Sequence, residues 1–451
     1  MDILRYTFLS LVVCGTAVAQ AESCVADGKH FRVVCHFDDK AVTRQALAVV
    51  EAVWSPTLKV LGVRPSRSKH KLLAVHLYRN AADYVAAEAK LTAGEFKRNL
   101  AFAHFGSKTA HVAVQPNLSE AFLRDRGLNY QTLRLLIHEA AHLVRYHTTP
   151  NYRSHPDWYT EGSASWLEVT VLKTMGHLTD SVADPHFSDM IFRGQRLLSE
   201  NKFPSLSAIL RDEAVKLELF DRYSVHWLLF DFLYTTERKT TDWWVANMRR
   251  LGGGKSLAVR LADKLAKKLR GKKFDSLAAR FQQHVKDLEP QWEEKYRSLE
   301  TGKKDWIVTA FDTVNAVAWR TEAAGEEPWT LTGAATVLPG KKTQLNLLLG
   351  RRPKGFVAIS LAAGSGVTVF DHEMEGNRWT TLAFARSPAL AVAKRVSFRV
   401  SVADGRLRIV LNGEQVLETE VKVPMAGEWG VGALAGSSGV WHDVKLKRAK
   451  R

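Results

Sequence analysis

The stretch Leu136-Ile-His-Glu-Ala-Ala-His142 decides the fold, together with Glu161, which follows nineteen residues after His142. In a helix of 3.6 residues per turn, His138 and His142 lie one turn apart on the same face, so both imidazoles can reach one ion. Glu139 lies about 100° further round the helix, which places its carboxylate beside such an ion and not on it. There it can accept a proton from a metal-bound water. The pattern therefore predicts the zinc site of a hydrolase.

The segment that carries the motif is a good helix former. No Pro or Gly interrupts residues 130–147, and an apolar face is supplied by Leu133, Leu136, Ile137, Ala140, Ala141 and Val144. The alternative interpretation is a half-buried helix with two hydrogen-bonded histidines. This alternative is the weaker interpretation, because two histidine ligands, a neighbouring base and a third ligand occur together in the sequence.

The spacing of the ligands distinguishes between families of zinc hydrolases. A metzincin-like site needs Gly at position 145 and His at position 148, where this chain has Arg145 and Thr148. The arrangement HEXXH, eighteen residues, Glu instead resembles the gluzincin metallopeptidases, the thermolysin-like and aminopeptidase-like branch of the zincins. The segment 158–164, Trp-Tyr-Thr-Glu-Gly-Ser-Ala, resembles the second-helix signature of that clan, especially its bacterial branch of inferred peptidases.

The resemblance implies a role for each matching residue. His138, His142 and Glu161 would bind Zn²⁺, water would occupy the fourth position, and Glu139 would be the general base. Two positions depart from the pattern. Thermolysin-like enzymes have an Asp that orients the first histidine, where this chain has Ser165. Glu168 lies two turns beyond Glu161 on the same helix face. It either orients that histidine in place of the Asp or is a solvated helix residue. No Gly-x-Met-Glu-Asn segment occurs upstream, so aminopeptidase specificity is not expected.

Other segments suit a catalytic domain without proving one. Residues 110–115 alternate like a strand, which is either a substrate-binding edge strand or an ordinary strand inside a sheet. Residues 218–234 predict an apolar helix, in which Tyr223 or His226 are candidates to stabilise an oxyanion, although core packing is favoured for both. His147 and His155 are expected to lie at a helix end and in a turn, not on the metal.

The first residues indicate export. Residues 1–21 combine an Arg, a short apolar run and A-x-A-like sites, which is typical of a secretory signal peptide. No later run approaches the length of a membrane helix, so we expect an exported protein, in the periplasm, on the cell surface or outside the cell, without a transmembrane segment. Export leaves Cys24 and Cys35 as an even pair, for which a disulfide is a hypothesis. A tight turn at 27–28 would not place the two directly opposite each other.

Changes of periodicity divide the remainder. Residues 22–300 form one predicted domain. It is mixed α/β to about 188, with strands at 30–37 and 71–78 and a helix at 41–61, and then helical over 189–300. Of the net charge of +17, residues 238–304 contribute 18 Lys and Arg minus 8 Asp and Glu, or +10. This charge is typical of a solvated basic face; it could also attract polyanions. No nucleic-acid motif accompanies it, so nucleic acid is not an expected partner.

Residues 301–451 predict an all-β domain. Its short alternating segments include 344–349, 356–361, 396–402, 407–411 and 441–446, and residues 406–413 read as a strand entering a type I′ hairpin. The domain resembles laminin G-like or concanavalin A-like jelly rolls. The resemblance implies either a carbohydrate or cell-surface ligand or a role as a spacer.

Together these observations predict a multidomain chain: an α+β zincin-like catalytic domain with a helical second half, then an all-β sandwich. The expected function is that of an exported zinc metallopeptidase acting on a peptide or protein substrate. The alternative is a non-catalytic secreted protein that binds carbohydrate or a surface and keeps a relic zincin scaffold. The sequence does not decide between endo- and exopeptidase action.

Overall fold

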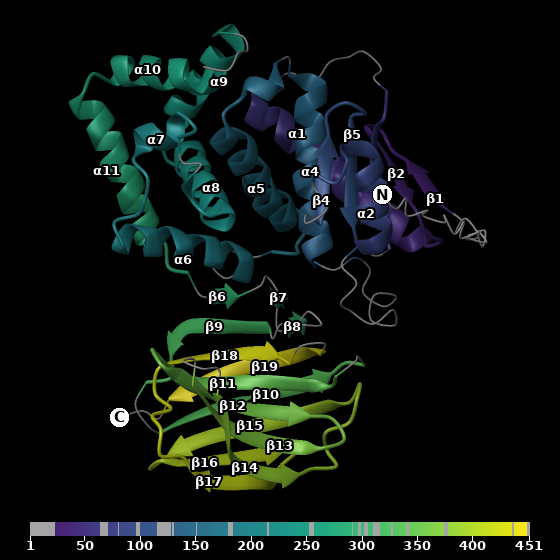
Figure 1. Ribbon diagram of the computed structural model, residues 1–451, viewed down its shortest axis with the longest axis vertical. Coiled ribbons are helices and arrows are strands. Elements are labelled where there is room, and N and C mark those ends of the chain that lie inside the picture. Colours follow the sequence, from purple (N-terminus) through teal and green to yellow (C-terminus); the bar gives the residue numbers. More distant parts are fainter. Residues whose placement is uncertain are drawn as a thin grey trace, which may run out of the picture.

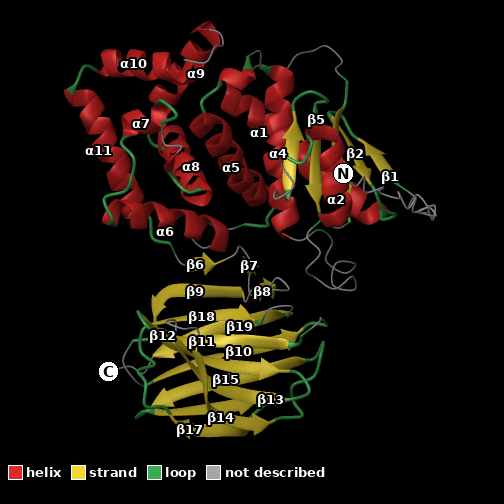
Figure 2. Cartoon of the chain, viewed as in Figure 1, coloured by secondary structure: helices red, strands yellow, loops and turns green. Residues whose placement is uncertain are grey.

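The computed structural model has an N-terminal α+β part and a C-terminal β-sandwich (Figure 1), which confirms the predicted fold class. In Figure 2 the first part combines helices (red) with a small sheet (yellow), and the second part is drawn as strands. The structure describes residues 23–63, 71–79, 81–95, 100–114, 128, 130–149, 151–178, 184–213, 216–251, 257–290, 292–295, 299–301, 305–309, 316–325, 328–339, 342–373, 378–434 and 437–448. The predicted signal peptide, residues 1–21, lies outside the described residues.

A five-stranded sheet organises the first part. Its order is β1-β2-β3-β5-β4, with bounds Cys24–Asp27, Phe31–Cys35, Leu73–Tyr78, Thr109–Ala113 and Ala101–His104 respectively. Strands β2, β3 and β5 are parallel, and β1 and β4 are antiparallel to their neighbours. The strand predicted at 110–115 is therefore the inner strand β5. The edge strand beside it is β4, so the interpretation of 110–115 as a substrate-binding edge is wrong.

The described helices of the α+β region are α1 (Lys40–Leu61), α2 (Ala81–Thr92), α4 (Tyr130–Thr148) and α5 (Asp157–Thr174). Helix α1 begins where the Asp39 side chain accepts hydrogen bonds from the backbone N–H groups of Ala41 and Val42. It ends at Gly62, whose φ of 60° is the left-handed conformation that glycine adopts without a Cβ clash. The buried faces of α1 and α4 belong to one core with strands β2, β3 and β5. That packing fixes α4 against the sheet.

The second half of this part is helical, as predicted. It contains α6 (Pro185–Ser199), α7 (Leu206–Leu210), α8 (Leu219–Thr235), α9 (Arg238–Leu251), α10 (Leu257–Leu269) and α11 (Lys272–Asp287). The short 3-10 helix η1 (Tyr152–Ser154) lies earlier, between α4 and α5. Lys264, Lys267 and Lys268 on α10 are exposed, in agreement with a solvated basic face. Among the described residues, no helix is long and apolar enough to cross a membrane.

Two antiparallel seven-stranded sheets form the sandwich. One has the order β17-β16-β15-β10-β19-β8-β7 and the other β14-β13-β12-β11-β18-β9-β6. The bounds in chain order are β6 Trp292–Lys295, β7 Leu299–Thr301, β8 Asp305–Thr309, β9 Ala316–Ala323, β10 Trp329–Val337, β11 Gln344–Arg352, β12 Gly355–Ala362, β13 Gly366–Glu373, β14 Arg378–Arg386, β15 Arg395–Ala403, β16 Arg406–Leu411, β17 Glu414–Glu420, β18 Glu428–Ala433 and β19 Ser438–Arg448. All five predicted strands are present.

The start of the sandwich differs from the prediction. Strands β6 and β7 pair with β9 and β8, so the sheets include residues that the sequence analysis assigned to the preceding domain. Helix α6 contacts both strands, and Figure 1 shows the sandwich directly below this helix. The predicted hairpin joins β16 to β17 through Asn412 and Gly413, whose φ values of 50° and 88° fit a type I′ turn.

The register of β1 and β2 places Cys24 directly opposite Cys35. The sequence analysis was wrong here, because the hairpin closes between Gly28 and Phe31, where Gly28 N–H donates to Phe31 O, and not at 27–28. Both cysteines are buried free thiols in this structure, and Cys24 Sγ donates to Asp38 Oδ1 at 3.1 Å. The disulfide stays a prediction.

Candidate metal centre

The two histidines of the motif and the distant glutamate meet between α4 and α5. The ring centroids of His138 and His142 lie 4.8 Å apart, one turn of α4 from each other. Glu161, on α5, brings Oε2 to 3.2 Å from His138 Nε2 and Oε1 to 3.6 Å from His142 Nε2. All three ligand atoms lie within 4.8 Å of one another, which makes this a candidate metal site in the described part of the chain.

The donor set fits a zinc ion. Two imidazole nitrogens and one carboxylate oxygen are donors that zinc accepts in catalytic sites, which leave one position for water. Both Nε2 atoms are directed toward the same carboxylate. The opposite ring nitrogen of His142, Nδ1, is buried without a hydrogen-bond partner among the described residues. The arrangement therefore accommodates a cation between Glu161 and the two Nε2 atoms.

The electrostatics of the site agree with this arrangement. Burial disfavours the charged form of His138, but the hydrogen bonds with Glu161 and Glu168 outweigh it and raise the pKa of this histidine to about 10. Burial also disfavours a charged Glu161, yet the two histidines hold the pKa of its carboxyl well below the usual value. Without an ion, the site keeps a proton on His138 beside an ionised Glu161. A dication would take the place of that proton.

Glu139 lies beside the ligands and is almost fully buried, at 7 % exposed. Burial raises the pKa of its carboxyl to about 7, with His138 opposing the shift and the other two glutamates adding to it. A carboxyl with a pKa near neutrality can both accept and release a proton at physiological pH. The sequence analysis assigned Glu139 this role.

Glu168 provides the hydrogen bond that Ser165 cannot. Its Oε1 lies 2.8 Å from His138 Nδ1, and its Oε2 accepts from Arg134 Nε at 2.7 Å. Glu168 is buried, so the interpretation as a solvated helix residue is wrong. Arg134, one turn before His138 on α4, also contacts His186 at the start of α6. This buried chain of partners holds the imidazole of His138 in one orientation.

The glycine after Glu161 determines how closely two helices approach. A Cβ on Gly162 would lie 2.4 Å from the carbonyl oxygen of His226 on α8, a distance that no side chain tolerates. Only glycine therefore lets α5 lie this close to α8. The start of α5 is held separately, because Asp157 N–H donates to Asp212 Oδ1 at 3.0 Å. The first contact fixes Glu161 relative to α8, and the second fixes the start of α5 relative to the residues that follow α7.

The two oxyanion candidates on α8 have different surroundings. The half-buried ring of Tyr223 lies 6.5 Å, centroid to centroid, from that of His138. His226 is buried, and burial lowers its pKa to about 4. The structure thus brings Tyr223 close to His138, and it buries His226 where α8 meets α5, within electrostatic reach of Glu161. His147 lies in the last turn of α4 and His155 directly after η1, and the candidate metal group consists of other residues.

An aromatic cluster that the sequence analysis missed lies next to His142. The ring of Tyr146, one turn further along α4, stacks on His142 at 5.9 Å. Phe105 lies 4.2 Å and Tyr152 4.5 Å from Tyr146, and Phe105 is 38 % exposed. Phe105 follows directly after the edge strand β4. The one signal in the sequence was the i, i+4 spacing of His142 and Tyr146; the other two rings meet it only through the fold.

Comparisons with known proteins give a partial likeness. No family model and no curated protein matches the chain. Similar solved structures include the carbohydrate-binding module CBM66 from Bacillus subtilis, at 14 % identity over 35 % of this chain and 95 % of that one, with a TM-score of 0.31. The exoplasmic/lumenal domain of VIP36 bound to Ca²⁺ and Man3GlcNAc has 16 % sequence identity over 36 % of this chain and 85 % of that one, with a TM-score of 0.30. Sheep galectin-11 in complex with glycerol has 13 % sequence identity over 28 % of this chain and 95 % of that one, with a TM-score of 0.24. The sandwich architecture itself is defined by the strand pairing described above.

Proposed function

We propose that this chain is an exported zinc-dependent peptidase of gluzincin type, with the sandwich as an accessory domain. The observation that carries the proposal is the convergence of His138, His142 and Glu161 from two helices, with the buried carboxyl of Glu139 beside them. Two imidazoles and a carboxylate with a neighbouring base are the parts of a hydrolytic zinc site. The export signal, which lies outside the described residues, is part of the same proposal.

Three side chains would hold the ion and one would move the proton. Zinc, when bound, lowers the pKa of a coordinated water and polarises the scissile carbonyl. Glu139 accepts the proton of the attacking water at its carboxylate and transfers it to the leaving amine. Its pKa near 7 suits both halves of that transfer. Glu168 accepts from His138 Nδ1–H, which leaves Nε2 as the ligand atom.

A peptide is the substrate that the surroundings favour. Among the described residues, β4 pairs with β5 alone, so its other edge can offer backbone groups to an extended chain. Helix α4 contacts β4, and the exposed ring of Phe105 follows the strand. A peptide paired with β4 would present a side chain to the cluster formed by Phe105, Tyr146 and Tyr152. Endo- and exopeptidase action both remain open within this proposal.

Metal content and activity test the proposal together. We expect about one zinc per chain in the wild-type protein and a loss of zinc in His142→Ala, measured by inductively coupled plasma mass spectrometry. A chelator should abolish hydrolysis of a peptide library, and added zinc should restore it. If neither protein takes up zinc even after incubation with the metal, the proposal fails. The non-catalytic alternative, a secreted carbohydrate- or surface-binding protein, would then be favoured.

A further inference from the structure

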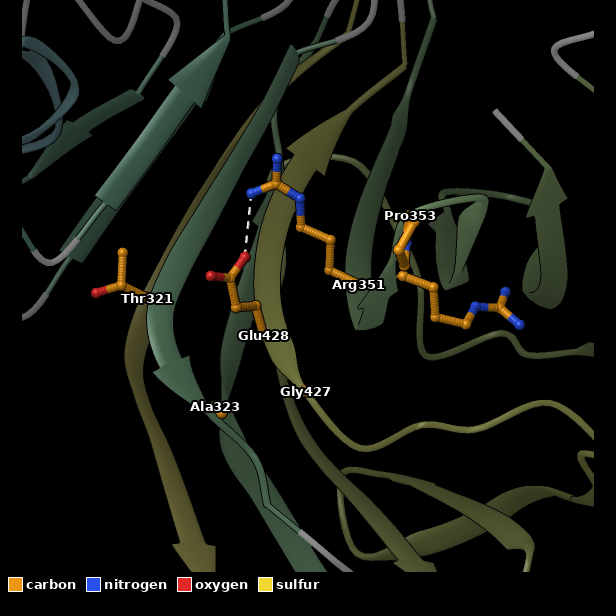
Figure 3. Close-up of a pocket in the computed structure, with 7 residues that line it drawn as sticks. Thr321, Ala323, Arg351, Pro353, Gly427 and Glu428 are labelled. Carbon is orange, nitrogen blue, oxygen red and sulfur yellow. Dashed lines mark hydrogen bonds and ion pairs between the residues drawn. The ribbon is translucent and has the colours of Figure 1, made fainter. Parts of the chain in front are cut away.

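Two depressions lined by described residues of the sandwich differ in how their charges are balanced. The first has a volume of about 520 Å³, and Figure 3 shows Arg351 and Glu428 directed toward each other across it. Their guanidinium and carboxylate groups lie 3.0 Å apart. The second cation of this depression, Arg352, pairs with Asp371 at 2.6 Å. The cations of this depression are thus paired with carboxylates of the protein itself, and they have little charge to offer an ionic ligand.

The second depression has a volume of about 530 Å³ and spans β15, β10 and β19 on the outer face of their sheet. Its lining contains three cations, Arg395, Lys445 and Lys447, against one carboxylate, Asp443. Asp443 pairs with Lys445 at 3.0 Å. In the described part of the chain, no acidic group lies within ion-pair distance of Arg395 or Lys447. This depression therefore has an unbalanced positive charge.

Neutral polar groups accompany these cations. Thr332 and Ser397 line the depression from β10 and β15, and Asn412 lines it from the turn after β16. Asn412 Oδ1 accepts from the backbone N–H and the hydroxyl of Ser397, at 3.0 and 3.2 Å. These bonds fix the amide at the rim. Together, Thr332, Arg395, Ser397, Asn412, Lys445 and Lys447 are called the basic trough below.

A bulge in β19 directs the lysines into the basic trough. Thr332 lies opposite Lys445 and Ala334 lies opposite His442, so β19 has one extra residue between them. The extra residue is Asp443, whose backbone has a left-handed conformation with φ of 49°. Without it, strict alternation would turn Lys445 and Lys447 into the core. With it, both lysines face outward and their apolar neighbours Val444 and Leu446 pack on the core. Bulges of this kind are enriched where a strand re-aims side chains for function.

We propose that the basic trough binds an acidic polysaccharide, through its carboxylate or sulfate groups. Arg395, Lys445 and Lys447 would pair with these anions, and the hydroxyl and amide groups would bond to the hydroxyls of the sugar rings. The described lining of this depression contains no Phe, Tyr or Trp, and its one imidazole, that of His442, is buried, so a platform for stacking unpaired bases is missing there, which disfavours single-stranded nucleic acid. The inference rests on the proposed accessory role of the sandwich and not on the metal centre.

Binding of the full chain to matched oligosaccharides tests the proposal. The probes are a chondroitin sulfate oligosaccharide, an oligogalacturonate, neutral dextran of similar size and single-stranded DNA of equal charge, compared by isothermal titration calorimetry. Arg395→Gln/Lys447→Gln removes two charges from the basic trough. Lys264→Gln/Lys267→Gln removes two exposed charges from α10 and is the matched control. We expect an acidic oligosaccharide to bind the wild type and the control alike, and the trough variant about tenfold more weakly.

Several outcomes would overturn the proposal. The proposal fails if the two double variants lose equal affinity for the acidic oligosaccharides, or if neither acidic oligosaccharide binds. It also fails if dextran binds as tightly as the acidic probes, or if DNA is preferred through the same residues. The variant Ser397→Ala removes a hydroxyl from the basic trough without a change of charge. It should weaken the binding of the acidic oligosaccharide and of no other probe. Zinc content and circular dichroism should be the same in all these proteins. His142→Ala should keep oligosaccharide binding, so a failed peptidase proposal and a failed trough proposal are distinguishable.

Discussion

Glu168 Oε1 lies 2.8 Å from His138 Nδ1, across the space between α5 and α4. Glu168 follows Glu161 by seven residues, which is two helical turns, so one face of α5 supplies both a proposed ligand and the group that orients a second proposed ligand. The side chain is one turn farther along α5 than Ser165, and a glutamate is long enough to reach. The metal centre can therefore keep an oriented histidine although its sequence departs from the thermolysin-like pattern.

The first prediction concerns this hydrogen bond. Glu168→Ala should weaken zinc binding by about 10- to 100-fold, because His138 loses the partner that fixes its ring and raises its basicity. Zinc affinity is measured by competition with a chromophoric chelator. Glu168→Gln, which keeps an acceptor but not the charge, should fall between the wild type and Glu168→Ala. A folded Glu168→Ala protein with wild-type zinc affinity would show that this contact does not support the site.

The second prediction separates the base from the ligands. Glu139→Gln should retain about one zinc per chain and lose turnover by about 10²-fold or more, because an amide cannot accept the proton of the attacking water. Turnover is measured on a peptide substrate and zinc content by mass spectrometry. His142→Ala is the comparison, since it should lose both. Peptidase activity retained in Glu139→Gln would exclude Glu139 as the base.

Local pattern explains what the sequence predicted about this site. The i, i+4 spacing of His138 and His142 fixes their common face once the helix forms, and α4 spans the predicted segment. The ends of α1 follow in the same way from Asp39 and Gly62. Such features depend on residues within a few positions of each other. They could be predicted because tertiary packing does not change which side chains share a face.

Features that depend on sheet order or distant contacts could not be predicted. Residues 110–115 had the alternation of a strand, but alternation does not say whether a strand is at an edge, and β4, with four residues, gave too short a signal. Phe105 and Tyr146 are forty-one residues apart and meet only because α4 packs on the sheet. The hairpin before Cys35 was misplaced because Asp27-Gly28 indicates a two-residue turn, whereas the loop also includes Lys29 and His30, and register depends on which residues close the turn.

The third prediction is a disulfide between Cys24 and Cys35. Directly paired positions on antiparallel strands have Cα atoms about 4.5–5.5 Å apart, which is within the range a disulfide spans. Oxidation of the exported protein should stabilise it by about 3 kcal/mol in the loop-entropy model. Intact mass with and without reductant detects the bond, and denaturation of Cys24→Ser/Cys35→Ser measures its effect. Two free thiols in protein recovered from an oxidising compartment would reject it.

The fourth prediction is a loss of stability in acid that originates in stacked histidines. The rings of His76 and His111, opposite each other on β3 and β5, stack at 4.9 Å, and His36 Nε2 lies 3.1 Å from His76 Nδ1. Burial lowers the pKa of His76 to about 4 and that of His111 to about 3. Below pH 6.5 these two histidines therefore bind protons in the unfolded chain but stay neutral in the folded chain until the pH reaches their lowered pKa values. The free energy of unfolding should fall as the pH falls from 6.5 toward 4.

Chemical denaturation between pH 7.5 and 4 tests this prediction. His76→Gln/His111→Gln should make the decline between pH 6.5 and 4 shallower, because neither replacement takes up a proton. Gln282→Ala, at an exposed position on α11 that takes up no proton, is the control and should keep the wild-type slope. Carboxyl groups contribute to acid unfolding in all three proteins, so the difference between the slopes isolates the two histidines. Identical slopes in the double variant and the wild type would contradict the prediction.

The last prediction concerns the aromatic cluster beside the metal centre. Phe105 keeps 38 % of its surface exposed although Tyr146 and Tyr152 pack against it, so a bound apolar side chain can still cover that surface. Phe105→Ala should raise KM for peptides with a large apolar residue near the scissile bond by about tenfold, because burial of that contact contributes about 1–2 kcal/mol. Turnover at saturation and zinc content should change little, since Phe105 does not touch the ligands of the proposed ion. Leu219→Ala, at an exposed apolar position on α8, is the control and should leave KM unchanged. A fall in kcat with constant KM would instead indicate that Phe105 positions His142 through Tyr146, and the cluster would then be a support for the ligand and not a surface for the substrate.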